Sequence, residues 1–380
     1  MHAPWRRYAA LSVVTALLAI VLLSSSCSRP ANDPWTPVSG LSGTAPIVSL
    51  TAVGDRLLAG TQTGDGVGAP GLTVLSGSSW TDLPVTPATP YGREARWLSV
   101  VAAADGALVA IGGARGGAHS NVRYTAWKGS VAAGLTEQEQ TFGTFGGWGA
   151  GEQVGPVLTP SGPMLIGSWE SAKSGLDIDV WLPQGERWIR QSSAGTALES
   201  TPTEMTGARS VTSLGAGALV SGSVIRLGNG EVRKLPAVWR SASGNSGWSR
   251  IDLPEAGRAG EAVAGTCAAE SCTIVGWVDG KLAVWRLDAS GARRLDGVPT
   301  VSVTDADELA APVLVDGLAV LLVTDHDSPG TAALLREGSR GWSREPGPGG
   351  SVAAFTAVGA ALYAVTRLGG SSPQLWSHPR

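Results

Sequence analysis

A short motif, a glycine/serine turn followed by tryptophan or a hydrophobic strand, recurs along the 380 residues of this chain. Copies stand at residues 75–85, 183–190, 243–254 and 337–347. The ending of the motif occurs once more near the N-terminus, as PWTPVSG at 34–40. A displaced copy is expected where repeats close into a ring and the last unit takes its final strand from the N-terminal segment. The sequence therefore predicts a closed circular repeat.

Seven units can be traced between residues 35 and 380, each with four expected strands, a to d. Alternating apolar residues between Gly/Ser/Asp turns favour strands. Units of about 40–50 residues with four strands each are typical of a β-propeller. The seventh unit ends after PQLWSHP at 373–379 without an outer strand, which we expect Trp35–Val38 to supply. The predicted fold is all-β, a seven-bladed β-propeller of four-stranded antiparallel blades closed by the N-terminal strand.

The blade pattern resembles the lipoprotein and secreted seven-bladed propellers of bacteria over residues 34–380. The Gly-His and Trp-Asp signatures of WD40 blades are missing. The turn at 241–248, SASGNSGW, lies where sialidase-type propellers carry Ser-x-Asp-x-Gly-x-Thr-Trp, but the aspartate is absent. The resemblance therefore implies a WD40/sialidase-like superfold without sialidase chemistry. Because lysine is rare among the basic residues, a GC-rich, actinobacterial-type genome is suggested.

The N-terminus has the features of a bacterial lipoprotein signal. Arg6 and Arg7 precede an apolar run over 8–23, and three serines precede Cys27. This resembles a lipobox, in which the cysteine is lipidated after cleavage. An ordinary secretory signal or a retained helical anchor are the alternatives, and export by either the Sec or the twin-arginine route stays open. The expected parts are a signal peptide (1–26), the lipidated cysteine with a short tether (27–34) and one propeller domain (35–380).

The charge balance limits the partners. The chain has 28 Lys+Arg and 31 Asp+Glu. Removing Arg6 and Arg7 leaves 26 against 31, a net charge of about −5. Because no basic excess is available for a phosphate backbone, nucleic acid is not an expected partner. We expect a monomer, anchored by its lipid to the outer face of the cell membrane, with an envelope protein or glycan as ligand.

Two cysteines besides Cys27 support an oxidising location. Cys267 and Cys272 flank the short turn AAES, which suits a cross-strand disulfide. Two free buried thiols are the alternative. A metal site is not expected here, because no histidine lies nearby in the sequence.

The recurrent tryptophans are expected to pack between blades, where a large ring buries much surface. Ligand stacking is the alternative for these residues, which are Trp80, Trp188, Trp248 and Trp342.

The two faces of the propeller are expected to differ. The a–b and c–d connections, on the face that we call the bottom, are short throughout. The d–a and b–c connections, on the face that we call the top, are long, and long loops are often functional. The long top loops are 61–71, 86–96, 114–121, 142–152 and 193–207. We therefore expect the ligand at the top face, with the tether entering at the bottom.

Aromatic residues in one glycine-rich top loop are the first binding candidates. Phe142, Phe145 and Trp148, with Glu152, could stack on a sugar or anchor a protein. The alternative is that they fold inward and plug the channel. His119, in the top loop 114–121, is a further candidate.

A second top loop contains Tyr91, Arg93, Glu94 and Arg96. A tyrosine/glutamate pair beside arginines resembles sialidase-type sites, in which arginines from several blades converge and hold a carboxylate. A solvated charged loop is the alternative.

Carboxylates at the top of the sixth blade are weak candidates for calcium. They are Asp305, Asp307, Asp325 and Asp327. No calcium-loop spacing is present, so ordinary acidic turns are the alternative and no metal or cofactor is predicted. We expect a second acidic pair, Asp177 and Asp179, on the solvent side of its strand.

The sequence thus favours a membrane-anchored extracytoplasmic binding or scaffold propeller. A glycan-active hydrolase or lyase with a site over the channel is the alternative. The fold does not choose between them.

Overall fold

The computed structural model describes residues 35–40, 46–63, 68–116, 120–228, 230–369 and 372–380. The expected signal peptide, Cys27, the tether and His119 lie outside the described residues. Among the described residues, no helix has both the length and the apolar character needed to cross a membrane.

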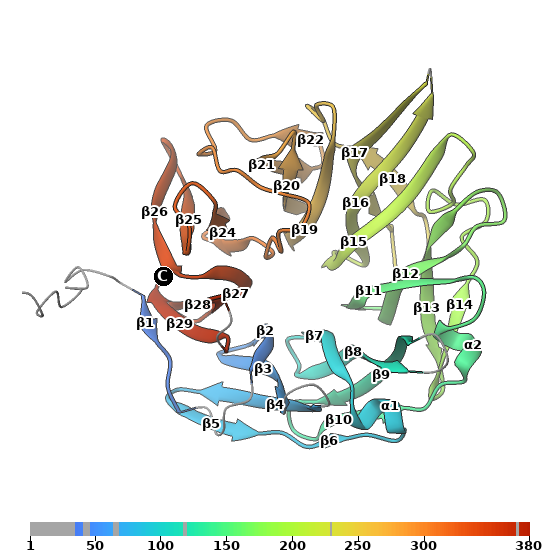
Figure 1. The fold of residues 1–380 in the computed structure, drawn as a ribbon, viewed down its shortest axis with the longest axis horizontal. Coiled ribbons are helices and arrows are strands. Elements are labelled where there is room, and N and C mark those ends of the chain that lie inside the picture. Colours follow the sequence, from blue (N-terminus) through green and yellow to red (C-terminus); the bar gives the residue numbers. More distant parts are fainter. Residues whose placement is uncertain (1–34, 41–45, 64–67, 117–119, 229, 370–371) are drawn as a thin grey trace, which may run out of the picture. The chain divides into compact units, whose positions relative to one another are not determined.

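Residues 35–380 form a ring of seven sheets, which confirms the predicted seven-bladed propeller (Figure 1). Blade 1 contains β2 (Ile47–Val53), β3 (Arg56–Thr63), β4 (Ala69–Ser76) and β5 (Ser79–Asp82). Blade 2 contains β7 (Arg96–Ala102), β8 (Ala107–Gly116), β9 (Asn121–Ser130) and β10 (Gly134–Gln138). Blade 3 contains β11 (Ala150–Thr159), β12 (Gly162–Glu170), β13 (Leu176–Gln184) and β14 (Arg187–Gln191). Blade 4 contains β15 (Glu204–Leu214), β16 (Gly217–Gly228), β17 (Glu231–Arg240) and β18 (Ser249–Asp252).

The other three blades follow the same order. Blade 5 contains β19 (Gly260–Ala268), β20 (Ser271–Val278), β21 (Lys281–Asp288) and β22 (Gly291–Arg294). Blade 6 contains β23 (Val313–Val315), β24 (Leu318–Asp325), β25 (Thr331–Gly338) and β26 (Gly341–Gly349). Blade 7 contains β27 (Ser351–Val358), β28 (Ala361–Arg367), β29 (Gln374–Pro379) and β1 (Thr36–Pro37). Two one-turn helices, α1 (Pro90–Arg93) and α2 (Phe142–Phe145), lie in the connections that enter blades 2 and 3.

The N-terminal strand closes the ring as the displaced motif predicts. β1 pairs antiparallel with β29, with Thr36 opposite Ser377. Trp35 is buried and its ring centroid lies 4.8 Å from that of His378. Since β29 ends at the bottom face, an antiparallel β1 begins there.

The core is divided among the seams of the ring. Seven clusters of buried residues each join neighbouring blades. The third-strand tryptophans of blades 3, 4 and 5 are fully buried, and each indole N–H donates to a carbonyl in the top connection that enters its own blade. These bonds join Trp181 to Thr144 (2.8 Å), Trp239 to Ala197 (2.9 Å) and Trp285 to Pro254 (2.9 Å). The tryptophans therefore fasten the top connections as well as filling the seams.

The tryptophans of the recurrent motif also pack, as expected. Trp188 is fully buried, while Trp80, Trp248 and Trp342 are half-buried beside their seams.

The predicted disulfide is present. Cys267 and Cys272 are paired across the turn between β19 and β20, with Cα atoms 4.0 Å apart. Cys272 is fully buried, so the bridge joins the bottom of blade 5 to the core of that seam.

The expectation for Asp177 and Asp179 is wrong, because both side chains are buried between blades rather than solvated. Asp177 accepts from the backbone N–H of Ser200 (2.6 Å) and from the Ser193 hydroxyl (2.6 Å). Asp179 pairs with Arg190 at 2.7 Å, and burial nevertheless raises the pKa of its carboxyl. The alternation of charged and apolar residues along β13 therefore marks an internal polar layer, not an exposed face.

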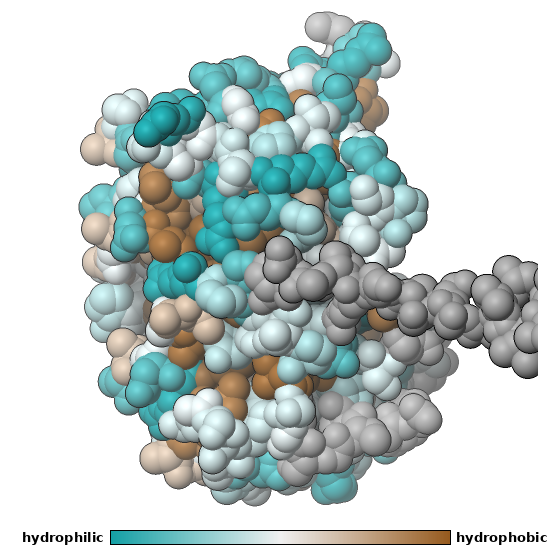
Figure 2. Space-filling model, turned by 90° about the vertical axis from the view of Figure 1, so that its left-hand side faces the viewer, coloured by the Kyte–Doolittle hydropathy of each residue, from teal (hydrophilic) through white to brown (hydrophobic). Residues whose placement is uncertain are grey.

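The bottom half of the channel is a cavity of about 660 Å³, lined by the inner strands of all seven blades. None of the described residues that line it is Asp, Glu or His. At its bottom end the Arg380 side chain donates to the carbonyls of Leu314 (2.7 Å) and Gly359 (3.1 Å). On the side of the ring that carries β1 and β26, hydrophobic residues gather in separate patches among hydrophilic ones (Figure 2), as on ordinary solvated surfaces.

Candidate ligand-binding site between blades 2 and 3

The top connections that enter blades 2 and 3 meet at one pocket. It encloses about 280 Å³ on the outer rim of the top face, where α1 and α2 lie (Figure 1). Tyr91 of α1 and Phe142 and Phe145 of α2 line it, together with Arg123 and Tyr124 from the top end of β9. Residues of two separately predicted loops thus share one site.

The α1 side of the pocket is held by a buried carboxylate. Glu137, in the outer strand β10, is 6% exposed. One of its oxygens accepts from the backbone N–H groups of Ala88 (2.7 Å) and Thr89 (2.8 Å), and the other accepts from the Thr89 hydroxyl (2.6 Å). Thr89 is also the N-cap of α1, accepting from Gly92 N–H at 2.9 Å. Both oxygens of Glu137 are therefore used to fix the turn that carries Tyr91.

Two glycines allow this arrangement. A Cβ at Gly92 would lie 1.9 Å from Glu137 Oε2, and one at Gly116 would lie 2.4 Å from the Tyr91 ring. Glycine therefore permits both close approaches. A short strand, β6 (Val85–Thr86), precedes α1 and runs parallel to β10, with Val85 opposite Leu135.

The α2 side is held by aromatic rings that pack against one another in tilted and edge-to-face contacts. Phe145 is 5% exposed, and its ring lies 5.9 Å from that of Trp181. The ring centroid of Trp169 lies 6.3 Å from that of Trp181, and the guanidinium carbon of Arg190 lies 4.7 Å from the Trp169 ring centroid. Arg190 is in turn paired with buried Asp179. Since Trp181 also bonds to Thr144 in α2, this helix is fixed from below and presents Phe142 outward.

The mouth of the pocket combines an exposed ring with a cation. Phe142 is 61% exposed, and the Arg123 guanidinium carbon lies 4.6 Å from its ring centroid. Among the described residues, no carboxylate forms an ion pair with Arg123. Burial raises the pKa of Tyr124, so its hydroxyl stays protonated beside them. The site therefore presents aromatic faces next to a cation that no internal acid neutralises.

Other predicted site residues lie outside this pocket. Arg96 donates to the Gln62 side chain at 2.7 Å, and Arg93 and Glu94 end α1 without lining the pocket. Trp148 is fully exposed in the connection beyond α2, and Glu152 is exposed at the start of β11. The loop 142–152 thus contains one buried aromatic residue, Phe145, and two exposed ones, Phe142 and Trp148, and none of the three lines the bottom channel cavity.

Three of the four weak calcium candidates have separate partners and are not brought together. Asp307 bonds to His326 (2.8 Å) and to Thr304 N–H (2.6 Å). Asp325 pairs with Arg344, and Asp327 accepts from Ser302 at 3.4 Å. Within the described residues no group of three or more His, Cys, Asp or Glu side chains could hold a metal. The described residues therefore give no support to a calcium site formed by these four aspartates, Asp305 included.

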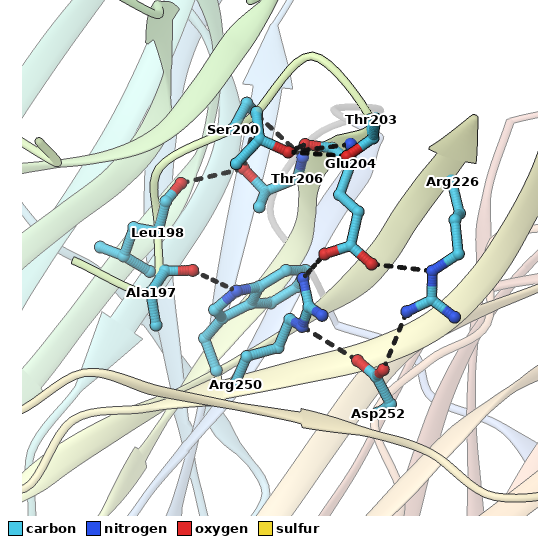
Figure 3. A network of polar contacts seen from close by, with 11 residues as sticks. Ala197, Leu198, Ser200, Thr203, Glu204, Thr206, Arg226, Arg250 and Asp252 are labelled. Carbon is cyan, nitrogen blue, oxygen red and sulfur yellow. Dashed lines mark hydrogen bonds and ion pairs between the residues drawn. The ribbon is translucent and has the colours of Figure 1, made fainter. Parts of the chain in front are cut away.

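A second polar feature of the top face is a closed ring of charges on blade 4 (Figure 3). Two carboxylates, Glu204 and Asp252, alternate with Arg226 and Arg250. Their ion pairs are Glu204–Arg226 (2.7 Å), Arg226–Asp252 (3.1 Å), Asp252–Arg250 (3.0 Å) and Arg250–Glu204 (2.8 Å). Hydrogen bonds from Arg250 and Arg226 hold the pKa of Glu204 below its ordinary value. Every charge here is matched inside the protein.

Two essential pocket residues were missed by the sequence reasoning. Arg123 and Glu137 lie in strands, whereas the sequence candidates for this site lie in loops. A usable signal for Glu137 is its position two residues after Leu135 in LTEQ. Alternate residues of a strand lie on one face, and Leu135 and Glu137 share the buried face of β10. No sequence signal singles out Arg123.

Comparison with known proteins supports the fold and nothing finer. No protein-family model and no curated protein sequence matches this chain. Among solved structures, the propeller domain of the trilobed protease from Pyrococcus furiosus, described as having an open velcro topology, is similar with a TM-score of 0.53 at 7% identity, over 88% of this chain and 95% of that one. A polysaccharide lyase, an ulvan lyase bound to -[GlcA(1-4)Rha3S]-, has a TM-score of 0.52 at 9% identity, over 88% and 94%. A chain of a mitotic checkpoint complex has a TM-score of 0.51 at 12% identity, over 96% and 99%.

Proposed function

We propose that this protein is a membrane-anchored extracytoplasmic binding propeller, which captures its ligand in the pocket between blades 2 and 3. The observation that carries the proposal is the meeting of Tyr91, Phe142 and Arg123 at one pocket whose two sides are fastened by Glu137 and Trp181. Preorganised aromatic and cationic groups bind ligands at low entropic cost.

The anchoring part of the proposal rests on the sequence of residues 1–27 and on the direction of β1. Because β1 begins at the bottom face, a lipid on Cys27 would tether the protein from that side. The seven residues between Cys27 and Trp35 reach at most about 25 Å. The bottom would then face the membrane, and the pocket would face outward.

Binding is a better description of this pocket than hydrolysis. Glu137 is the one carboxylate among the described residues that line it, and both its oxygens are occupied. Glycoside hydrolysis generally needs two carboxylates placed across the scissile bond. The described residues of the channel cavity supply none.

The test is capture of envelope glycans and proteins by the immobilised full chain. Phe142→Ala should abolish capture, because it removes the exposed ring at the mouth. Leu318→Ala is the control, since Leu318 is also an exposed apolar residue but begins β24 at the bottom face. Equal capture by wild type and Phe142→Ala would reject the pocket as the binding site.

A further inference from the structure

We infer that the ligand of this pocket is an acidic sugar, bound with its ring on the aromatic mouth and its carboxylate on Arg123. The inference rests on the proposed binding function and specifies its ligand class.

The position of Arg123 is suited to an external anion. Its guanidinium carbon lies 4.6 Å from the Phe142 ring centroid, within the range of a cation–π contact. The N–H donors of a guanidinium lie in its plane, so a stacked group can still form a two-point contact with a carboxylate. No described carboxylate competes for these donors, in contrast to Arg226 and Arg250 in the charge ring of blade 4.

The hydrogen-bonding groups around Arg123 leave donors available and few acceptors. Gln138 Oε1 accepts from the Trp188 indole at 3.0 Å, and Gln140 uses its amide oxygen and nitrogen within the protein. Thr125 Oγ1 accepts from the Trp127 indole at 2.9 Å. Both Glu137 oxygens are engaged, as described above. The Gln138 amide N–H₂ has no partner among the described residues, and the Thr125 hydroxyl hydrogen is not donated to any of them. A ligand with acceptors can use these donors, and a carboxylate and sugar hydroxyl oxygens supply such acceptors.

The backbone around the pocket favours a sugar over an extended peptide. Peptides are commonly bound by adding a strand to an open sheet edge. Here the outer edge of β10 is covered by β6, which pairs with Leu135 and Thr136, and the segment after β6 is bonded to Glu137. The volume of about 280 Å³ lies at the small end for ligand sites, which suits one ring with its substituents. Tyr91 and Phe142 offer flat faces at its opening.

The experiment measures binding of the full chain, purified in detergent, to a panel of immobilised oligosaccharides. The acidic probes end in glucuronic, galacturonic or sialic acid, and each is paired with a neutral analogue that lacks the carboxylate. A short peptide ending in phenylalanine with a free carboxylate is the third probe class. Variants are Arg123→Gln and, as control, Arg187→Gln, which removes an exposed arginine from the bottom turn of blade 3.

We expect at least one acidic probe to bind at least about tenfold more tightly than its neutral analogue, with a preference that weakens as salt is added. Arg123→Gln should remove this preference, while Arg187→Gln should keep it. Equal binding of acidic and neutral probes, both lost in Phe142→Ala, would overturn the anion inference and leave the binding site in place. Arg123-dependent binding of the peptide but of no acidic sugar would overturn the sugar assignment. Absence of binding to every probe would overturn the inference, whereas the proposed function fails only on unchanged envelope capture by Phe142→Ala.

Discussion

Two regions of the top face use arginine in opposite ways. On blade 4, Arg226 and Arg250 each contact two carboxylates, and the charges form a closed internal ring. In the pocket between blades 2 and 3, Arg123 lies against an aromatic ring and forms no ion pair with any carboxylate of the described residues. A long, charged top segment is therefore not by itself a binding site. In the pocket, by contrast, no described carboxylate pairs with Arg123, and Glu137 and Trp181 hold the neighbouring helices in place.

The two regions also differ in the side chains that their connecting segments leave at the surface. The segment that enters blade 4 is bonded to strands on both sides, since the Ser200 hydroxyl donates to Leu176 O of β13 at 2.6 Å and accepts from Thr206 N–H of β15 at 2.9 Å. The helices α1 and α2 are also anchored to strands, through Glu137 and Trp181, but they carry aromatic side chains that are exposed at the surface. Their exposed sides, Tyr91 and Phe142, are thereby left for another molecule.

The largest effect is expected at the anchor of α1. Glu137→Ala leaves the donors at Ala88 and Thr89 without their buried acceptor, so the free energy of unfolding should fall by at least about 2 kcal/mol. Ligand capture should fall with it, because Tyr91 loses its fixed turn. Chemical denaturation and a binding assay measure the two effects. Glu139→Ala, at the exposed neighbour, should change stability by less than about 0.5 kcal/mol; a similar loss in both variants would contradict the anchoring role.

A second experiment makes the pocket resemble blade 4. Phe142→Glu places a carboxylate beside Arg123, and Phe142→Gln removes the ring without adding charge. Because an internal acid should then compete for the guanidinium, the glutamate variant should bind acidic probes at least several-fold more weakly than the glutamine variant. Surface plasmon resonance at low salt compares them. Equal affinities would show that Arg123 does not meet the ligand charge.

The third experiment opens the ring of charges on blade 4. Glu204→Gln should reduce the free energy of unfolding by about 1 kcal/mol or less, since the network is solvated and screened. Ligand capture should not change.

The lowered pKa of Glu204 also predicts how the effect of Glu204→Gln on stability changes with pH. The folded-state pKa of Glu204 lies below its ordinary value of 4.5. Its contribution to stability is therefore present above about pH 4.5 and is lost as the pH falls through the lowered pKa. Thermal unfolding should show wild type and Glu204→Gln converging in acid. A constant difference down to pH 2 would contradict ionic stabilisation.

The smallest effect on stability is expected at Trp148. Its side chain is fully exposed, so Trp148→Ala should change the free energy of unfolding by less than about 0.5 kcal/mol. If the ligand extends from the pocket over the loop 142–152, capture should weaken in this variant while stability is kept. A stability loss above 1 kcal/mol would show instead that the residue packs.

The fold was predictable because its signal is repeated. Seven copies of one four-strand pattern, and a displaced β1, leave few topologies open, and the turn between Cys267 and Cys272 has the spacing of a bridge. The loops that carry Tyr91 and Phe142 were predictable from their length. Their meeting was not, because it depends on which neighbouring blades bring their top ends together.

The burial of charged groups could not be predicted from the sequence either. The pattern of β13 does not distinguish a solvated carboxylate from a buried one that is paired with a neighbouring strand, and Asp179 belongs to the second kind. Arg123 forms no ion pair with any described carboxylate, and the sequence of its own strand does not indicate this. Contacts between blades therefore decide the site, while the repeats decide the fold.

The most direct test of the central claim is a crystal structure of the protein with the tightest-binding acidic oligosaccharide of the panel. We expect ligand density between α1 and α2, with the sugar ring against Phe142 and the carboxylate within hydrogen-bonding distance of Arg123. Density in the central channel or on blade 4, with the pocket between blades 2 and 3 empty, would contradict it.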